Sequence, residues 1–236
     1  MNNNTITLKI KERLNKLDSN DYDNLKCWQI VEAFNKGMIE LCRENTRGIN
    51  ITKEGDEQSI SRIDDLQVLI TDPLKLNLTD KGIYYQSSIT DWPKDYLRFK
   101  GTNVTIKREC CDEPILCNFY LGEEANKTIY LRDNNKKPSY DWEESFLTIT
   151  GNKLNFYHDN QFQIDEAFLI YYRQPRKIEI NGCKDPYTNL TPTVDVECEF
   201  QDDLVELFIS KAASILAGDM ESIQKNRLDP EIEKNN

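Results

Sequence analysis

The chain has 236 residues, of which 38% are hydrophobic and 10% aromatic, and it carries a formal net charge of −11 at neutral pH. This length buries about 70% of the unfolded surface, which is enough for one large domain or two small ones. The acidic balance argues against nucleic-acid binding by phosphate neutralisation, since that mode needs clustered Lys and Arg. No apolar run approaches the roughly 20 residues of a membrane span. The composition predicts a folded protein with a very polar exterior.

The seven cysteines form an odd number without the spacing of a disulfide framework, and no secretory leader precedes them. This pattern indicates a reducing cytoplasm. The adjacent Cys110 and Cys111, followed by Cys117, do not match the short Cys-x-x-Cys spacing of zinc knuckles. We therefore expect free thiols in a strand here, and metal binding is the alternative.

Helical periodicity dominates the first 70 residues. Apolar residues recur every three or four positions in a short N-terminal helix: Ile6, Ile10, Leu14 and Leu17. A longer helix follows from about 23 to 44, with Asp23 as its cap and this stripe: Trp28, Val31, Phe34, Met38, Leu41 and Cys42. A third helical pattern, over residues 60–70, ends before Pro73.

From residue 75 the period changes to two, which predicts strands. Two hairpins are expected, one turning at 79–82 and one at Gly151-Asn152 between strands 146–150 and 153–157. Pro93 is expected to start either a turn or one helical turn. The other predicted strands cover 103–108, 115–121, 128–131 and 167–172, and the last is apolar on both faces as in a central strand.

The strongest helix pattern is the last one, from about residue 200 to 223. Its predicted apolar face combines Leu204, Leu207, Phe208, Lys211, Ile215 and Met220. Asp202 and Asp203 lie in its first turn, where carboxylates interact favourably with free amides and with the helix dipole.

The order of helices, strands and one closing helix predicts an α+β fold. The terminal helices need partners for their apolar faces, so we expect a helical bundle formed by the N-terminal helices and the C-terminal helix, with an inserted, mainly antiparallel β domain. The expected segments are 1–74 for the N-terminal helices, 75–184 for the β domain, and 185–236 for an acidic segment and the closing helix.

Motifs for catalysis are weak. The only histidine, His158, stands beside Asp159 without a nucleophile motif, so we interpret it as a surface histidine at a strand end. A carboxylate-dependent hydrolase built around His158 is the enzymatic alternative. The pairs Asp64-Asp65 and Glu143-Glu144 are interpreted as solvated or capping residues, and no glycine-rich phosphate loop is present. The sequence predicts no enzyme, cofactor or metal site.

Trp142 lies among polar residues, close to Tyr140, before a predicted strand. It is either an aromatic plug over the sheet edge or an interface anchor, because a Trp ringed by polar groups is typical of a binding hot spot. The candidate interface residues are Trp142, Tyr140, Asp202 and Asp203. The segment from Asp185 to the end contains twelve acidic residues and four basic ones. This charge run is either a solvated face or an acidic lining or docking tail.

Several motifs in a fixed order resemble head-to-tail connector proteins of short-tailed bacteriophages. They comprise residues 28–35, 93–97, 137–142, 150–153, 171–175 and 202–207, with Ala212-Ala213. More narrowly, the chain resembles the ring proteins of crAss-like phages, which are similar in role to tail tubular protein A adaptors. The likeness covers most of the chain, and it rests on the order of the motifs.

The resemblance implies a virion protein, assembled in the host cytoplasm, that forms a ring of twelve subunits below the portal protein. Its partners would be further copies, the portal, and neighbouring tail or ring proteins. Viral DNA would pass without specific binding, and no membrane is involved. An acidic lumen would repel DNA phosphates. The alternatives are another collar or tail-stub ring, a stopper, or a monomeric module that binds glycans or proteins through Trp142 and exposed tyrosines.

Overall fold

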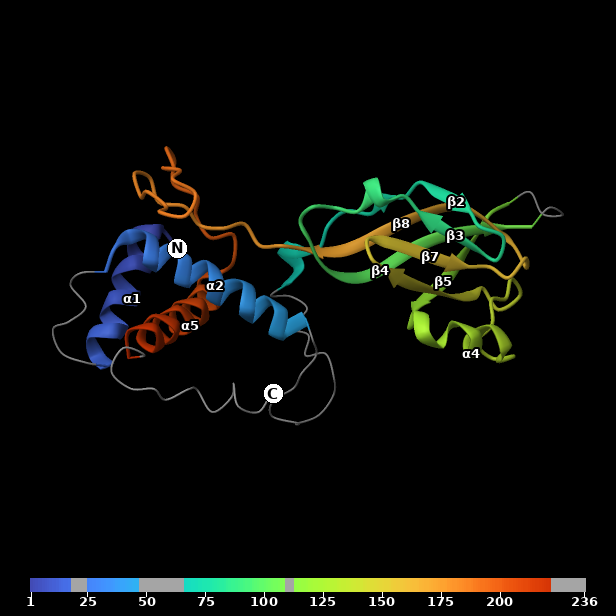
Figure 1. The fold of residues 1–236 in the computed structure, drawn as a ribbon, viewed down its shortest axis with the longest axis horizontal. Coiled ribbons are helices and arrows are strands. Elements are labelled where there is room, and N and C mark those ends of the chain that lie inside the picture. The colour runs from blue at the N-terminus through green and yellow to red at the C-terminus, as the bar shows by residue number, and fades with distance from the viewer. Residues whose placement is uncertain (18–24, 47–65, 109–112, 222–236) are drawn as a thin grey trace. The chain divides into compact units, whose positions relative to one another are not determined.

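A computed structural model of the chain describes residues 1–17, 25–46, 66–108 and 113–221 (Figure 1). The chain forms two compact units. We call Met1–Val68 with Pro175–Asn236 the helical unit, and Leu69–Gln174 the β unit. The described residues contain four α-helices and an eight-stranded, mostly antiparallel, curled sheet. The predicted α+β class is confirmed, as is the mainly antiparallel character of the sheet.

The helical unit contains α1 (Asn3–Leu17), α2 (Cys27–Thr46) and α5 (Asp202–Glu221). The predicted apolar stripe of α1 is confirmed, since Ile6, Ile10 and Leu14 are fully buried. Helix α2 starts later than expected, where the Lys26 amide donates to the Gln29 side chain in half of a capping box. The expected cap Asp23 lies outside the described residues. Most of the predicted helix 60–70 also lies outside them, and its described end contains the short 3₁₀ helix η2 (Gln67–Leu69).

Helix α5 contacts both α1 and α2. Its buried face follows the expected 3.6-residue period, but on a different set of residues: Leu204, Val205, Phe208, Ile209, Ala212, Ala213 and Leu216. Leu207 was predicted to lie on this face and is 56% exposed, so that prediction is wrong. At 100° per residue, Leu207 lies about 200° around the helix from Val205, on the opposite side. Small residues allow close approach, because a Cβ on Gly37 of α2 would lie 3.3 Å from the Ala212 amide.

The β unit forms one sheet with strand order β1-β8-β4-β5-β6-β7-β3-β2. The strands are β1 (Leu74–Lys75), β2 (Leu78–Asp80), β3 (Tyr84–Ser87), β4 (Tyr96–Lys107), β5 (Ile115–Leu121), β6 (Glu144–Thr150), β7 (Lys153–Tyr157) and β8 (Gln163–Arg173), and the short η3 (Ile89–Asp91) precedes β4. Both predicted hairpins, β2–β3 and β6–β7, are confirmed. Glycine supplies a positive φ in each turn, at Gly82 and Gly151.

The sheet curls until its two edges meet. The edge strands β1 and β2 are separated by residues 76 and 77 alone. The Leu76 amide donates to Ala167 of β8, whereas the Asn77 carbonyl accepts from Ser88 beyond β3. One short stretch of chain therefore bonds to both ends of the sheet. The enclosed face carries the apolar core: Leu76, Val104, Ile106, Cys117, Phe119, Leu147, Leu154, Phe156, Phe162, Ala167, Leu169 and Tyr171.

The predicted strand at 128–131 is wrong, because these residues belong to α4 (Lys127–Arg132), which follows η4 (Glu124–Asn126). Their β-branched and aromatic side chains favour a strand locally. However, β5 and β6 are parallel neighbours, and parallel strands need a crossover outside the sheet. In this crossover the Tyr130 ring lies 5.1 Å from that of Phe146. Gly122 is required beside it, since a Cβ there would come within 2.8 Å of Tyr130.

One buried side chain connects α2 to the irregular chain that follows the β unit. Asn35 accepts from the Ile178 amide (2.9 Å) and donates to the Ile178 carbonyl (3.2 Å). We expect Asn35→Leu to lower the free energy of unfolding by about 2–4 kcal/mol, because it leaves two buried backbone groups without partners. Urea denaturation measures this loss. The neighbouring exposed substitution Lys36→Leu serves as a control and should change stability by about 0.5 kcal/mol or less; equal losses in the two variants would contradict the assignment.

Candidate interaction surfaces

Trp142 is presented on a tight turn that we call the Trp142 turn (residues 139–144). An antiparallel bridge joins Ser139 to Glu144, and the Trp142 amide donates to Ser139 Oγ (3.3 Å). Glu143 adopts a positive φ of 53°. The Trp142 side chain is 81% exposed, so its interpretation as a plug over the sheet is wrong. Leu116 on β5 is also exposed, at 68%. Both are large apolar side chains in contact with water.

Tyr140 points the other way and packs against the core of the β unit. Arg108 lies 4.3 Å above its ring, and it also binds the Asp141 carboxylate (3.2 Å) and the Gln161 carbonyl (3.3 Å). Arg108 therefore fastens the base of the Trp142 turn to the loop after β7. Tyr140 anchors this turn, while Trp142 is its exposed tip.

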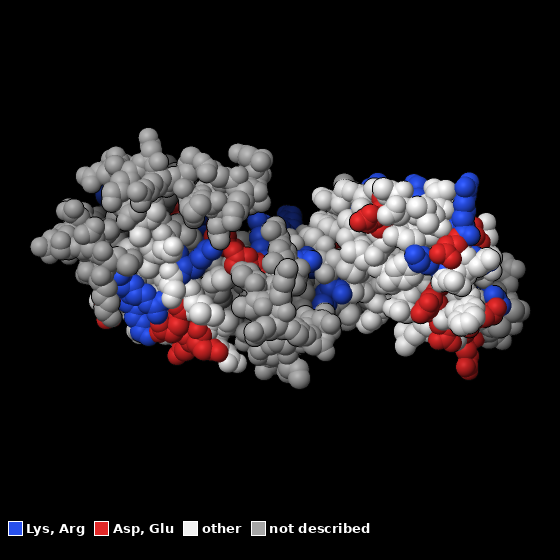
Figure 2. All heavy atoms as spheres, turned by 90° about the horizontal axis from the view of Figure 1, so that it is seen from below, with Lys and Arg blue, Asp and Glu red and all other residues white. Residues whose placement is uncertain are grey.

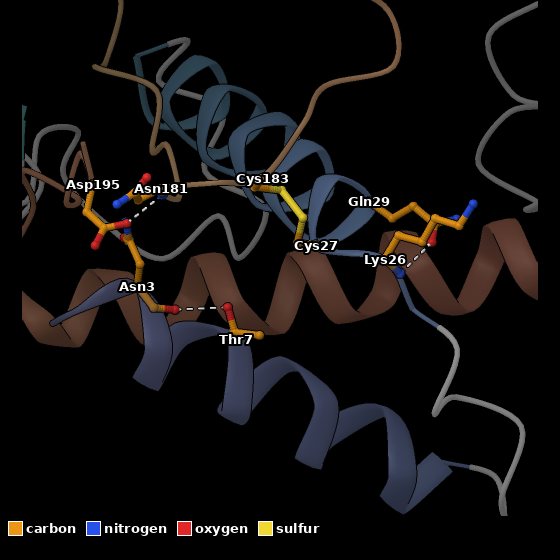
Figure 3. Close-up of a disulfide and its surroundings, with 8 residues drawn as sticks. All are labelled: Asn3, Thr7, Lys26, Cys27, Gln29, Asn181, Cys183 and Asp195. Atoms are coloured by element: carbon orange, nitrogen blue, oxygen red, sulfur yellow. Dashed lines mark hydrogen bonds between the residues drawn. A yellow bond between two sulfur atoms is a disulfide. The ribbon is translucent and has the colours of Figure 1, made fainter. Parts of the chain in front are cut away.

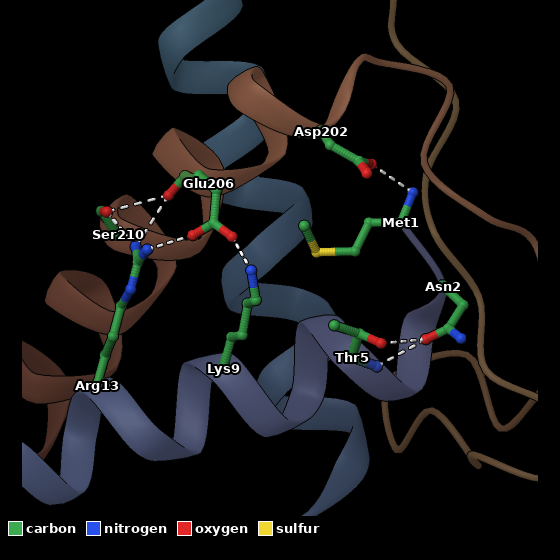
Figure 4. A network of polar contacts seen from close by, with 8 residues as sticks. All are labelled: Met1, Asn2, Thr5, Lys9, Arg13, Asp202, Glu206 and Ser210. Carbon is green, nitrogen blue, oxygen red and sulfur yellow. Dashed lines mark hydrogen bonds and ion pairs between the residues drawn. The ribbon is translucent and has the colours of Figure 1, made fainter.

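Asp202 and Asp203 lie in the first turn of α5, as predicted. The Asp202 carboxylate pairs with the Met1 amino group (2.7 Å), and one turn later Glu206 binds both Lys9 and Arg13 of α1 (Figure 4). Arg13 also donates to the Glu206 carbonyl (2.9 Å). These ion pairs are partly exposed, so they orient α1 on α5 more than they stabilise the contact.

The two aspartates and the Trp142 turn belong to different compact units. Asp202 and Asp203 belong to the helical unit, whereas Trp142 and Tyr140 belong to the β unit. The four predicted interface residues therefore form two separate groups, one on each unit.

A groove of about 680 Å³ opens in the helical unit, between α2 and residues 177–192. Its α2 wall is a helical stripe that includes Trp28, Val31 and Ile39, and the facing wall includes Tyr187 and Leu190. The rings of Trp28 and Tyr187 meet edge to face at 5.8 Å. Tyr187 and Leu190 are 73% and 69% exposed. Sequence reasoning assigned Trp28 and Val31 to the apolar stripe of α2 and did not anticipate this groove.

A disulfide joins Cys27, the first residue of α2, to Cys183, which lines the groove (Figure 3). The cysteine spacing did not indicate this bond, since the two residues lie 156 positions apart. Nearby, Asp195 accepts from the Asn181 amide (2.7 Å), and Asn3 donates to the carbonyls of Glu179 and Val196. The irregular segment is thus held by side chains and one covalent bond.

Other described cysteines are free. Burial raises the pKa of the Cys42 and Cys117 thiols to about 12, which makes both inert at neutral pH. Cys117 is buried in β5, as expected of a free thiol in a strand. Cys110 and Cys111 lie outside the described residues. Within the part of the chain that the structure describes, no group of three or more His, Cys, Asp or Glu could hold a metal ion.

His158 follows β7 as predicted, but it is only 4% exposed, so the expectation of a surface histidine is wrong. Its Nδ1 accepts from the Asn160 amide (3.1 Å), and its ring lies 4.8 Å from that of Tyr85. Burial lowers the pKa of His158, and the charges of Asp80 and Asp159 only partly offset this effect. Within the described residues, Nδ1 is bonded only to a backbone amide and Nε2 makes no hydrogen bond, so this geometry gives the alternative of a hydrolase no support.

Several acidic residues after Asp185 serve as local acceptors. Asp185 accepts from the Tyr187 amide (2.8 Å), which lowers the pKa of its carboxyl, and Glu199 accepts from the Arg176 amide (2.8 Å). These contacts explain part of the acidic run as turn capping. On the face of the β unit shown in Figure 2, acidic and basic side chains are interspersed, and uncharged surface surrounds them.

Comparisons with protein-family models and with curated proteins find no match to this chain. Among the helices of the described residues, none is both long enough and apolar enough to cross a bilayer.

The disulfide generates one prediction. Cys183→Ser should lower the free energy of unfolding of the helical unit by roughly 2–5 kcal/mol, the usual cost of losing a disulfide that closes a long loop. Thermal unfolding with and without a phosphine reductant measures this. The reductant should destabilise the unsubstituted protein and leave Cys183→Ser and Cys27→Ser unchanged. A reductant effect that persists in the variants would exclude this bond as its source.

His158 generates a second prediction. Because the folded imidazole binds a proton more weakly than the unfolded one, its contribution to stability is complete above a pH of about 6.5 and declines as the pH falls towards the folded pKa. NMR titration of the only histidine gives the folded value directly, and we expect a midpoint below 6.5. His158→Gln should weaken the loss of stability between pH 7 and 5. A midpoint at or above 6.5 would show that the imidazole is solvated.

Proposed function

We propose that this chain is a virion structural protein that forms an oligomeric ring of a head-to-tail connector, below the portal, with a channel for DNA and a platform for tail assembly. The observation that supports this best is the layout: helices from both chain ends contact one another through α5, and a curled sheet is inserted between them. The resembled family implies this layout. We infer that α1, α2 and α5 act as one bundle, which faces the portal or a neighbouring subunit.

Ring formation requires two different surfaces on each subunit, because identical subunits joined head to tail meet through unlike faces. The chain offers two candidates of unlike shape. The Trp142 turn is a protrusion with an 81% exposed aromatic tip, and the groove beside α2 is a concave surface with exposed Tyr187 at its rim. Aromatic side chains are enriched at interface hot spots, so both surfaces are suited to protein contacts.

The charge is compatible with a DNA channel. With a net charge of −11, the chain as a whole repels phosphates, and Asp202 and Asp203 concentrate negative charge at the start of α5. We propose that the acidic segment after Asp185 lines the channel or docks on the portal. Asp185 keeps its charge while it caps a turn, because the hydrogen bond from the Tyr187 amide lowers the pKa of its carboxyl, so both roles are compatible.

A monomeric module that binds proteins or glycans is the second candidate, and the exposure of Trp142 favours it equally. Another collar or tail-stub ring, or a stopper, would share the proposed layout. Oligomeric state separates the binding module from these ring proteins, and the position of density on the portal separates the connector from the other rings.

The test is the mass of the protein alone and mixed with the portal protein of the same genome, measured by mass photometry and followed by electron-microscopy class averages. We expect a dodecameric ring on one portal face. A protein that stays monomeric and ignores both the portal and neighbouring virion proteins would contradict the proposal and favour the binding module.

Trp142→Ala sharpens this test. Loss of a hot-spot Trp typically costs 2 kcal/mol or more of binding, so the variant should weaken ring or portal association at least tenfold. Stability should change by about 0.5 kcal/mol or less, because the side chain is exposed. Ile129→Ala removes another exposed apolar side chain, 60% exposed on α4 of the same unit, and should have little effect. If Trp142→Ala assembles as well as the unsubstituted protein, then Trp142 is not part of the interface.

A further inference from the structure

The imidazole of His158 has one nitrogen without a partner. Its Nε2 is buried and makes no hydrogen bond, and its side chain is only 5% exposed. A buried donor without an acceptor is unfavourable, so such an atom in a folded protein requires an explanation. Next to it a pocket of about 550 Å³ is lined by Asp80, Tyr85, Lys107, Arg108, His158, Asn160, Gln161, Phe162 and Gln163.

The hydrogen bond at Nδ1 determines which nitrogen of the ring carries the proton. Because Nδ1 accepts from the Asn160 amide, the neutral imidazole carries its proton on Nε2. Nε2 is therefore a donor, so it cannot bind a metal ion or an ammonium group without losing that proton. The backbone holds this arrangement in place: Asp159 and Asn160 both have positive φ, and the Gln161 amide donates to the His158 carbonyl. The pocket offers a neutral donor in a fixed position.

The nearest acceptor decides the ligand class. Asp80 Oδ1 lies 3.9 Å from Nε2, too far for a hydrogen bond, and it accepts from the Gly82 amide (2.7 Å). An anion at this position would meet the Asp80 charge, and a cation could not accept from Nε2. A hydroxyl group accepts from one neighbour and donates to the other, so it satisfies both. The Asp80 side chain is 57% exposed, so a ligand can reach its carboxylate from solvent.

The cations beside the pocket do not change this conclusion. Lys107 pairs with Asp165 (2.7 Å), and Arg108 is held by Asp141 and the Gln161 carbonyl. Side-chain amides from Asn160, Gln161 and Gln163 add further donors and acceptors, while the Tyr85 and Phe162 rings supply apolar surface. A few placed polar groups among aromatic rings are typical of small-molecule pockets of this size.

We propose that this pocket binds a neutral polyhydroxylated ligand, one sugar unit of a glycan, through a hydroxyl that bridges His158 Nε2 and Asp80. The pocket shares Arg108 with the base of the Trp142 turn but does not include Trp142, and sugar binding there does not depend on ring formation. A glycan-binding pocket would give the protein a ligand in addition to its protein partners.

The single histidine makes the test direct. NMR signals of the only imidazole can be followed while the full-length protein is titrated with millimolar glucose, galactose, mannose and N-acetylglucosamine, and separately with inorganic phosphate. We expect at least one sugar to shift the His158 Nε2–H signal saturably, and phosphate to leave it unchanged. No saturable shift with any of the sugars, as would occur if a water molecule alone satisfies Nε2, would overturn the proposal, and so would binding of phosphate in place of sugars.

Substitutions in and outside the pocket test where the sugar binds. Isothermal titration should show at least tenfold weaker sugar binding for His158→Phe and at least threefold weaker binding for Asp80→Asn, whose amide oxygen can still accept from Gly82. Gln163→Ala, at the exposed rim of the pocket, replaces His158→Phe in this test if that variant does not fold. Asp72→Asn removes an exposed carboxylate of the same unit outside the pocket and should bind normally. Equal affinity in all variants would place the sugar elsewhere and overturn the proposal.

Discussion

The antiparallel pairing of the first and last strands of the β unit is the constraint on which the layout depends. Ile70 is bridged to Tyr172, the Thr71 amide donates to Tyr171, and Leu74 is in register with Leu169. The chain therefore leaves the β unit beside the point where it entered. Because entrance and exit coincide, helices from both chain ends can contact one another, although residues 47–201 lie between α2 and α5 in the sequence. Local helix formation alone could not bring α5 to α1 and α2.

The irregular chain after β8 shows a different kind of stabilisation. Within the described residues it has no strand ladder, and Asn3, Asn35 and Cys183 attach it to the helices. Such a segment has a defined position without a large core of its own. It can therefore present exposed side chains such as Tyr187 and Leu190, whose substitution would cost the fold little. The Trp142 turn follows the same principle, because Arg108 and Tyr140 secure its base while its tip remains in water.

Periodicity in the sequence predicted most elements because helix and strand patterns are local. It failed where a distant contact decides the outcome. Residues 128–131 favour a strand locally, but the parallel pairing of β5 and β6 forces a helical crossover. The exposure of Leu207 and the burial of His158 depend on which neighbours surround them. The Cys27–Cys183 bond joins residues far apart in the chain, which spacing cannot reveal. For the candidate surfaces, an exposed Trp142 was one of two open interpretations, whereas the groove and the His158 pocket exist only after folding.

The disulfide also has a topological consequence. It links residues 27 and 183, so the entire β unit lies inside one covalent loop. A protease that cuts the chain once anywhere in that loop opens the loop without releasing a fragment. Likewise, a force applied at the two chain ends bypasses the β unit, because tension passes through the sulfur bridge. As long as the bridge is intact, the β unit can unfold and refold without lengthening the connection between the two termini.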